Sequence, residues 1–289
     1  MSKTWLITGS ARGLGRFIVE AALAAGDNVL ATARDPGRLD DLKAVHGDRL
    51  ASFMLDVTDM MAAQAAVEAA VAAFGRLDVL VNNAGFGHLA PFEQASEVDF
   101  RSQIDTNFYG VVNLSRAALP VMRRQRAGHI IQLSSVGGRM GTPGMSAYQA
   151  AKWAVGGFTE VLAKETAGFG VKVVAVEPGG MRTDWGYNAR GNAPELLPEY
   201  QASVGAIQQL LQHYVGHEIG DPAKVAQVIV DLTRRESVPT HLLLGSDAQH
   251  VFNQADAVRR QEAEAWADVT RSTDFDGTDL SILARLRVD

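Results

Sequence analysis

The chain has 289 residues, 47% of them hydrophobic, and a formal net charge of −6 at neutral pH. A chain of this size can bury one full core with both faces of a sheet covered, so a single domain is the default expectation. Lys and Arg are scattered rather than gathered into runs, which argues against nucleic acid or an anionic membrane as a partner and favours a small molecule. There is no cysteine, which excludes disulfides and thiolate metal sites and fits a reducing compartment.

The first residues and the apolar segments favour a cytoplasmic location. Residues 1–8 run directly into a strand-like segment, with no signal-peptide core and no cleavage site. The alanine-rich stretch 61–74 is interrupted by Gln64 and Glu68, and no apolar run approaches the roughly 20 residues that span a bilayer. We therefore expect a cytoplasmic protein without membrane contact.

Short runs of apolar residues recur along the chain and alternate with longer stretches of helical spacing. Each run is nearly continuous in apolar residues, as in a strand that is covered on both faces. The alternation predicts an α/β fold, a Rossmann-type doubly wound parallel sheet of about seven strands with helices on both faces. The predicted strands are 5–8, 28–33, 51–55, 77–81, 129–133, 171–176 and 241–244, and residues 185–198 are expected to be irregular.

A glycine-rich turn follows the first predicted strand and opens a predicted helix. Glycine permits the tight turn and lets the backbone approach a pyrophosphate, while the helix N-terminus offers free N–H groups and partial positive charge. A plain strand-to-helix turn also uses glycine, but the position at the start of the chain favours a dinucleotide site. The cofactor contacts predicted here are Gly9, Ser10, Arg12, Gly13, Leu14 and Gly15.

The end of the second predicted strand indicates which dinucleotide is bound. NAD-preferring sites commonly carry an acid here, whereas this chain has Arg34, with Arg12 in the glycine turn. Two guanidinium groups could bind the 2′-phosphate of NADP through charge-assisted hydrogen bonds. The alternative is that both are solvated surface arginines, and Asp35 could partly neutralise Arg34. NADP(H) is therefore the preferred cofactor, and NAD(H) remains possible.

Tyr148 and Lys152 lie four residues apart on a predicted helix, so that the phenol and the ammonium share one face. A nearby positive charge favours the phenolate and lowers the tyrosine pKa, which would allow proton exchange with an alcohol or a ketone. Such a pair occurs by chance in many helices. Ser146 and Gln149 have the spacing of a capping box at the start of this helix.

The surroundings of this pair carry further motifs in a definite order. Ser135 ends the fifth predicted strand, and Asn107 lies in a long helical stretch. In this arrangement the chain resembles the short-chain dehydrogenase/reductase family, in its single-domain form, from about residue 3 to residue 245. The matching segments are the glycine turn at 8–15, then 56–57, 82–85, 107–110, Ser135, Tyr148 with Lys152, and 178–183.

The resemblance implies a role for each catalytic position. Tyr148 would be the general acid in reduction and the general base in oxidation, and Ser135 would hydrogen-bond the carbonyl oxygen. Lys152 would hold the nicotinamide ribose and depress the Tyr148 pKa, and Asn107 would anchor a water that leads protons to Lys152. Ser134 is the alternative to Ser135 as the catalytic serine. Asn107 could instead only hydrogen-bond to the helix backbone.

The resemblance also implies cofactor contacts along the rest of the chain. Asp56 would bond the adenine amino group, although Asp56 and Asp59 could simply cap the helix that begins near Met60. Thr183 would hold the nicotinamide carboxamide, unless it is only a helix cap. Together with Tyr148, Lys152 and Arg34, the predicted contacts are Asp56, Val57, Asn83, Ala84, Gly85, Pro178, Gly179, Met181 and Thr183.

The predicted reaction is the interconversion of a ketone or aldehyde and an alcohol by hydride transfer. Residues 31–34 and 176–179 resemble the hydroxysteroid and retinol dehydrogenase branch, which favours an apolar substrate. Phe86, Met140, Met145 and Trp185 are among the candidates for an apolar pocket. The rival hypothesis is a non-catalytic NADP(H)-sensing regulatory protein of the same fold.

The chain is predicted to consist of residues 1–245, a Rossmann domain carrying both sites, and residues 246–289, a helical extension packed on the same domain. An apolar stripe on this extension fits a packed surface helix, an oligomer contact or a substrate lid. The family resemblance implies a homodimer or homotetramer. His213 and His217 have metal-pair spacing but no third ligand, so no metal site is predicted. His88 is either near the substrate mouth or an exposed loop residue.

Overall fold

A computed structural model describes residues 2–191, 193–279, 281 and 283. Its centre is a sheet whose order is β3-β2-β1-β4-β5-β6-β7, with every neighbouring pair of strands parallel. This confirms the predicted fold class. The strands are β1 (Thr4–Ile7), β2 (Asn28–Ala33), β3 (Leu50–Met54), β4 (Val79–Asn82), β5 (Gly128–Leu133), β6 (Val171–Pro178) and β7 (His241–Leu244).

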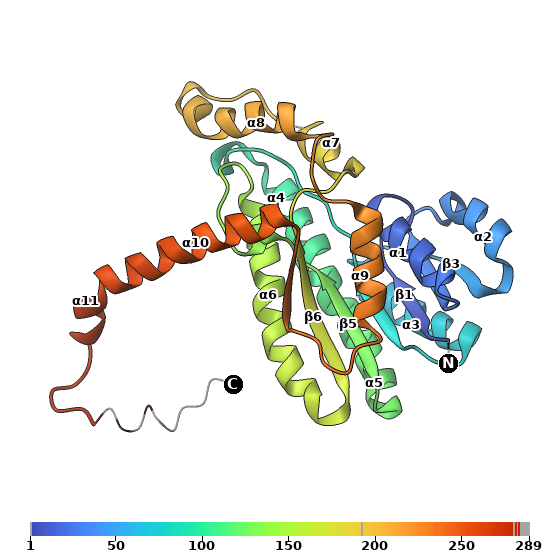
Figure 1. Cartoon of the computed structure of the whole chain (residues 1–289). Coiled ribbons are helices and arrows are strands. Elements are labelled where there is room, and N and C mark those ends of the chain that lie inside the picture. The colour runs from blue at the N-terminus through green and yellow to red at the C-terminus, as the bar shows by residue number, and fades with distance from the viewer. Residues whose placement is uncertain (1, 192, 280, 282, 284–289) are drawn as a thin grey trace.

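Helices cover both faces of the sheet, as Figure 1 shows. One hydrophobic cluster joins the sheet to α1 and α9, and a second joins its other face to α3, α5 and α6. The helices are α1 (Gly13–Ala24), α2 (Asp40–His46), α3 (Met60–Phe74), α4 (Glu97–Ile104), α5 (Gly110–Gln125), α6 (Ser146–Thr166), α7 (Asp184–Gly191), α8 (Ala206–Tyr214), α9 (Pro222–Leu232), α10 (Ser246–Ala265) and α11 (Ala267–Arg271).

The strand order reverses between β1 and β4, and this reversal positions the site. Because β1 pairs with β2 on one side and with β4 on the other, the chain runs outward in opposite directions from the middle of the sheet. The loops that follow β1 and β4 therefore leave a crevice between them at the carboxyl edge. In Figure 1, α7 and α8 lie above this same edge.

Two local expectations were wrong. Residues 184–191 form α7, although the segment from 185 onward was predicted to be irregular, because a helix of about two turns tolerates Gly and Asn when tertiary packing overrides propensity. The capping box at the start of α6 does not form. Gln149 instead accepts a hydrogen bond from the Thr142 backbone N–H (2.7 Å) and donates to the Thr142 hydroxyl (3.0 Å), so it fastens the preceding loop.

The segment after β7 begins on the body and then leaves it. α10 starts beside β7, and Arg259 lies over the Trp153 ring, 5.1 Å from its centroid. Beyond this contact α10 and α11 extend away from the sheet in Figure 1. Residues 280, 282 and 284–289 of the predicted extension lie outside the described residues, and the division at residue 245 stays a prediction. No described helix combines the length and apolarity needed to cross a bilayer.

A buried carboxylate joins the start of the chain to its later elements. Asp27, only 2% exposed, accepts hydrogen bonds from the Trp5 indole N–H (2.9 Å) and the Lys3 backbone N–H (3.0 Å). It also pairs with Arg234 at 3.0 Å, just beyond α9. Three donors converge on one carboxylate, and within the described residues the Trp5 indole N–H has no other acceptor.

We predict that Asp27→Ala lowers the free energy of unfolding by about 3 kcal/mol, because it leaves a fully buried indole N–H without an acceptor and removes an ion pair. Urea unfolding monitored by circular dichroism measures this change. Asp41→Ala, which breaks an exposed pair with Arg16, is the matched control and should cost much less. Equal losses in the two variants would contradict the importance of the buried carboxylate.

Candidate active site

The glycine turn lies against the loop that follows β4. Gly9 has a positive φ of 68°, and a Cβ on Gly15 would lie 2.3 Å from the Gly9 carbonyl oxygen and 2.5 Å from the Asn83 side chain. Only glycine fits a separation this small. The turn therefore forms a backbone cradle at the N-terminus of α1, the arrangement that binds phosphate groups.

Thr8 holds the two halves of this cradle together, and the sequence analysis did not single it out. Its hydroxyl accepts hydrogen bonds from the backbone N–H groups of Asn83 (2.9 Å) and Ala84 (3.0 Å). The Asn83 side chain in turn donates to the Thr8 carbonyl at 2.9 Å. The sequence feature that could have pointed to Thr8 is a hydroxyl side chain directly before Gly9, the first glycine of the turn.

The other predicted cofactor residues fall into two groups. Ser10 is fully buried and its hydroxyl donates to the Ile7 carbonyl, so it braces the turn from inside. Leu14 and Val57 are also buried. Arg12 and Arg34 are exposed, and neither guanidinium group forms a hydrogen bond or a salt bridge with another described residue, which leaves both available for an anion.

Asp56 lies just beyond β3, close to the second strand. Its carboxylate accepts from the Thr58 backbone N–H (2.9 Å) and hydroxyl (2.7 Å), and these bonds, with a smaller contribution from Arg34, lower the Asp56 pKa. Asp59, by contrast, caps α3 by accepting from the N–H groups of Met61 and Ala62. The two acids therefore have separate roles, and Asp56 remains free for a ligand on its exposed side.

Tyr148 and Lys152 lie on the face of α6 that is turned toward the carboxyl edge. Both side chains are buried, at 9% and 5% exposed. The Lys152 ammonium lies 5.6 Å from the centroid of the Tyr148 ring and donates to the Leu133 carbonyl at 2.6 Å. Ser135 lies two residues beyond the end of β5, and its side chain hydrogen-bonds with the Tyr148 phenol. The three predicted side chains are therefore brought together.

The geometry also separates the two adjacent serines. The Ser134 hydroxyl is buried and donates to the Lys152 backbone carbonyl at 3.2 Å. The Ser135 hydroxyl is half-buried, reaches Tyr148 and accepts from the Gly137 N–H at 3.0 Å. Ser134 thus fastens α6 to the sheet, and Ser135 is the one beside the phenol.

Asn107 lies in a π-helical turn, Asp105–Tyr109, between α4 and α5. Its amide donates to the carbonyls of Phe86 (2.7 Å) and Gln103 (2.8 Å), and it accepts from the Phe86 N–H at 3.2 Å. A Cβ on Gly85 would lie 2.5 Å from the Asn107 side-chain oxygen and 3.7 Å from the Lys152 ammonium. The Gly85 backbone is therefore the point where these two side chains meet.

His88 lies on the far side of the same loop. Its Nδ1 contacts the Asp99 carboxylate, and its backbone N–H donates to the buried Gln103 side chain at 3.1 Å. Gln103 also donates to Asp99 at 2.9 Å. His88 is thus engaged with α4 and braces the loop, rather than being a free loop residue.

An aromatic side chain covers the phenol. The ring centroids of Tyr148 and Trp185 lie 5.0 Å apart. Both rings pack against Gly87, where a Cβ would lie 2.9 Å from Trp185. Met145 belongs to the same apolar cluster as Tyr148. Of the predicted pocket residues, Trp185 and Met145 therefore adjoin the phenol.

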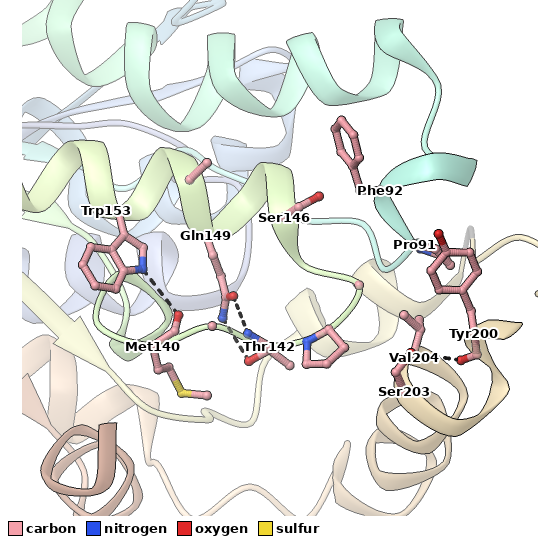
Figure 2. Close-up of a pocket in the computed structure, with 14 residues that line it drawn as sticks. Pro91, Phe92, Met140, Thr142, Ser146, Gln149, Trp153, Tyr200, Ser203 and Val204 are labelled. Atoms are coloured by element: carbon pink, nitrogen blue, oxygen red, sulfur yellow. Dashed lines mark hydrogen bonds between the residues drawn. The ribbon is translucent and has the colours of Figure 1, made fainter. Parts of the chain in front are cut away.

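A pocket of about 510 Å³ opens next to this cluster, on the outer side of α6. Figure 2 shows it between Trp153 and Gln149 of α6, the 140–144 loop and Tyr200. Met140 lines it, whereas Tyr148 and Ser135 do not. The pocket therefore adjoins the reactive groups without containing them.

The segment after β6 completes the carboxyl edge. Pro178 ends β6, and Met181 forms an isolated parallel bridge with Gly220. Thr183 accepts a long hydrogen bond from the Trp185 N–H (3.4 Å), and its Cβ lies 3.7 Å from the position of a Cβ on Gly13. The predicted nicotinamide turn and the glycine turn are therefore neighbours. Among the described residues, no group of three or more His, Asp or Glu side chains is arranged to hold a metal.

Comparison with known proteins gives the family. The family model described as short chain dehydrogenase matches residues 3–193. An oxidoreductase from Botryotinia fuckeliana, BOA17, is 45% identical over 93% of this chain and 98% of its own. The 3-ketodihydrosphingosine reductase of Bacteroides thetaiotaomicron is 34% identical over 86% of this chain and 89% of its own. The chain belongs to the short-chain dehydrogenase family.

Similar solved structures agree with this assignment. The crystal structure of a short-chain dehydrogenase from Streptomyces avermitilis has a TM-score of 0.87 and 41% identity, and the match covers 95% of this chain and 100% of the other. ElxO with NADP bound has a TM-score of 0.70 and 29% identity over 84% of this chain and 96% of its own. The chain is thus a short-chain oxidoreductase, while the hydroxysteroid branch stays a prediction.

Burial controls the charges of this short-chain dehydrogenase site. It raises the pKa of Tyr148 to about 12, with the Ser135 hydrogen bond acting in the opposite direction, and it lowers the pKa of Lys152 to about 8. The expected lowering of the Tyr148 pKa is not seen in this structure, because removing the phenolate from water raises the pKa. A Lys152 pKa near 8 leaves this group able to gain and lose a proton near neutrality.

The buried Lys152 should make stability depend on pH. Its folded pKa lies below the unfolded value of 10.5, so the unfolded chain binds more protons between pH 8 and 10 and stability rises with pH there. Relative to Lys152→Met, the wild type should gain about 2 kcal/mol across this window, and Tyr148 does not affect the comparison because both proteins contain it. Urea unfolding at several pH values measures the difference, with Lys164→Met on the exposed side of α6 as control. A pH-independent difference would contradict the assignment.

Proposed function

We propose that this protein is an NADP(H)-dependent oxidoreductase that interconverts a ketone or aldehyde and an alcohol. The observation that carries the proposal is the convergence of Tyr148, Ser135 and Lys152 at the carboxyl edge, beside the glycine cradle. A proton donor and a dinucleotide-type cradle are the two components that carbonyl reduction with a nicotinamide cofactor requires.

The chain's residues fit such a cofactor. A Cβ would fill the cradle at Gly9 and Gly15, and the unpaired Arg12 and Arg34 supply positive charge for a 2′-phosphate. Asp56 and the backbone of Asn83–Gly85 would receive the adenosine end. Pro178, Gly179, Met181 and Thr183 would receive the nicotinamide end. The neighbour ElxO has NADP bound, which supports the preference for NADP(H), with NAD(H) as the alternative.

The cofactor supplies the hydride when it is bound, and the residues of this chain manage the proton. Tyr148 donates the proton of its phenol to the substrate oxygen during reduction and takes it back during oxidation. Ser135 donates a hydrogen bond to the same oxygen and stabilises the charge that develops on it. Lys152 would hold the nicotinamide ribose, and with Asn107 behind Gly85 it would return a proton from solvent to the phenolate.

The substrate proposed is an apolar ketone or alcohol. Trp185 and Met145 adjoin the Tyr148 ring, and the pocket on the outer side of α6 has a mainly apolar lining. The named substrate of the Bacteroides relative is a 3-keto compound, which supports ketone reduction. These observations favour a small apolar molecule as the substrate.

The cellular setting is proposed with the function. We place the protein in the cytoplasm as a homodimer or homotetramer, with residues 1–245 as one domain and 246–289 as its extension. Exposed Trp153 and Val161 and the open side of Gly157 on α6 support a contact between copies, because an exposed glycine in a helix interior costs stability unless another surface approaches it.

We predict that Tyr148→Phe lowers the turnover of NADPH with a ketone panel by about 100- to 10 000-fold and leaves NADPH binding intact, because only the proton donor is removed. Loss of NADPH absorbance measures turnover, and NADPH fluorescence measures binding. Wild-type turnover in the variant would eliminate the tyrosine mechanism. Tight NADPH binding by a wild type that turns over no ketone would favour the NADP(H)-sensing alternative.

The cofactor preference has its own test. Arg34→Ala should raise the KM for NADPH by about 10- to 100-fold and leave the KM for NADH unchanged, since one charge-assisted contact to the 2′-phosphate is lost. Arg38→Ala, an exposed arginine just beyond Arg34, is the matched control and should change neither value. Parallel effects on both cofactors, or none, would remove Arg34 from the phosphate site.

A further inference from the structure

The first turn of α10 contacts the turn that follows β6. The backbone N–H of Gly180 donates to Oδ2 of Asp247 at 2.8 Å. The phenol of Tyr214, the last residue of α8, donates to the same oxygen at 3.1 Å. One carboxylate therefore joins three segments that are far apart in the sequence, and one of them is the predicted nicotinamide turn, 178–183.

Two consecutive glycines make this contact possible. A Cβ on Gly179 would lie 2.3 Å from both carboxylate oxygens of Asp247, and a Cβ on Gly180 would lie 2.3 Å from the Tyr214 phenol oxygen. Backbone hydrogen bonding from Gly179 N–H to the Leu244 carbonyl (2.9 Å) holds the turn against the end of β7. The glycines of this turn are therefore required by Asp247 and Tyr214, independently of any ligand.

The protonation states of Asp247 and Tyr214 keep the hydrogen bond between them intact near neutral pH. Burial raises the pKa of Tyr214 to about 12, and the negative charge of Asp247 acts in the same direction, so Tyr214 stays a hydrogen-bond donor at physiological pH. The other oxygen of Asp247, Oδ1, is buried and has no partner among the described residues. A buried acceptor without a donor is uncommon, so the two hydrogen bonds to Oδ2 are what hold this carboxylate against the turn.

We propose that Asp247, assisted by Tyr214, is a positioning residue that holds the nicotinamide turn in its binding conformation. The carboxylate acts through Gly180 and exchanges no proton with substrate. This inference rests on the proposed function, because the turn matters only if it receives the cofactor. It makes the start of α10 part of the cofactor site and couples α8, which overlies the carboxyl edge, to the same turn.

The test compares NADPH binding by fluorescence titration in the full chain. Asp247→Ala should raise the Kd for NADPH about tenfold, because the acceptor of two hydrogen bonds is lost. Asp247→Asn keeps one oxygen that accepts from Gly180 and should stay within about threefold of wild type, and Tyr214→Phe should raise the Kd about threefold. Asp256→Ala, on the same helix and paired with Arg259 and Arg260 of α10, is the control and should bind as wild type does.

The outcomes separate this inference from the proposed function. A wild type that binds no NADPH refutes the proposed function, and the inference falls with it. If the wild type binds NADPH and folded Asp247→Ala binds it equally well, the inference alone is overturned. Should Asp247→Ala fail to fold by circular dichroism, Tyr214→Phe decides, since a wild-type Kd in that variant overturns the proposal and a raised Kd beside unchanged Asp256→Ala supports it.

Discussion

The whole site depends on a close approach between the loops after β1 and β4, at the point where the strand order of the sheet reverses. Gly15 can pass the Gly9 carbonyl and the Asn83 side chain only because it has no Cβ, and Thr8 fastens the two loops with its hydroxyl and carbonyl. The resulting cradle consists of backbone and has little freedom to adapt. Everything that faces it, from the guanidinium groups on one side to the phenol on the other, is placed relative to this contact.

The second constraint is electrostatic. α6 buries a phenol and an ammonium together, so each resists its charged form: the Tyr148 pKa rises to about 12 and the Lys152 pKa falls to about 8. The cost to stability is offset elsewhere, in cores that cover both faces of the sheet. A phenol that keeps its proton is suited to donate it to an alkoxide-like oxygen, and a lysine near its own pKa is suited to pass protons onward.

Around this pair the structure adds supports whose residues belong to no motif. Gln103 and Asp99 hold the loop that carries Gly87 against Tyr148, and Gln149 holds the loop before α6. Asp247 does the same for the turn after β6. Gln103, Gln149 and Asp247 each accept a hydrogen bond from a loop backbone N–H, and Asp99 in turn accepts from the Gln103 side chain. The reactive groups are therefore held on loops by residues contributed from neighbouring helices.

The sequence by itself determined the sheet, its parallel arrangement, the glycine turn and the family, because apolar runs, glycine spacing and the Tyr148–Lys152 interval are local patterns that the chain carries in any conformation. It did not determine α7, the covering of Tyr148 by Trp185, the direction of the Tyr148 pKa shift or the link from Asp247 to Gly180. Those depend on burial and on pairs separated by many residues, and burial is a property of the packed chain. Only the tertiary structure decides which polar groups are removed from water and which side chains then supply their hydrogen bonds.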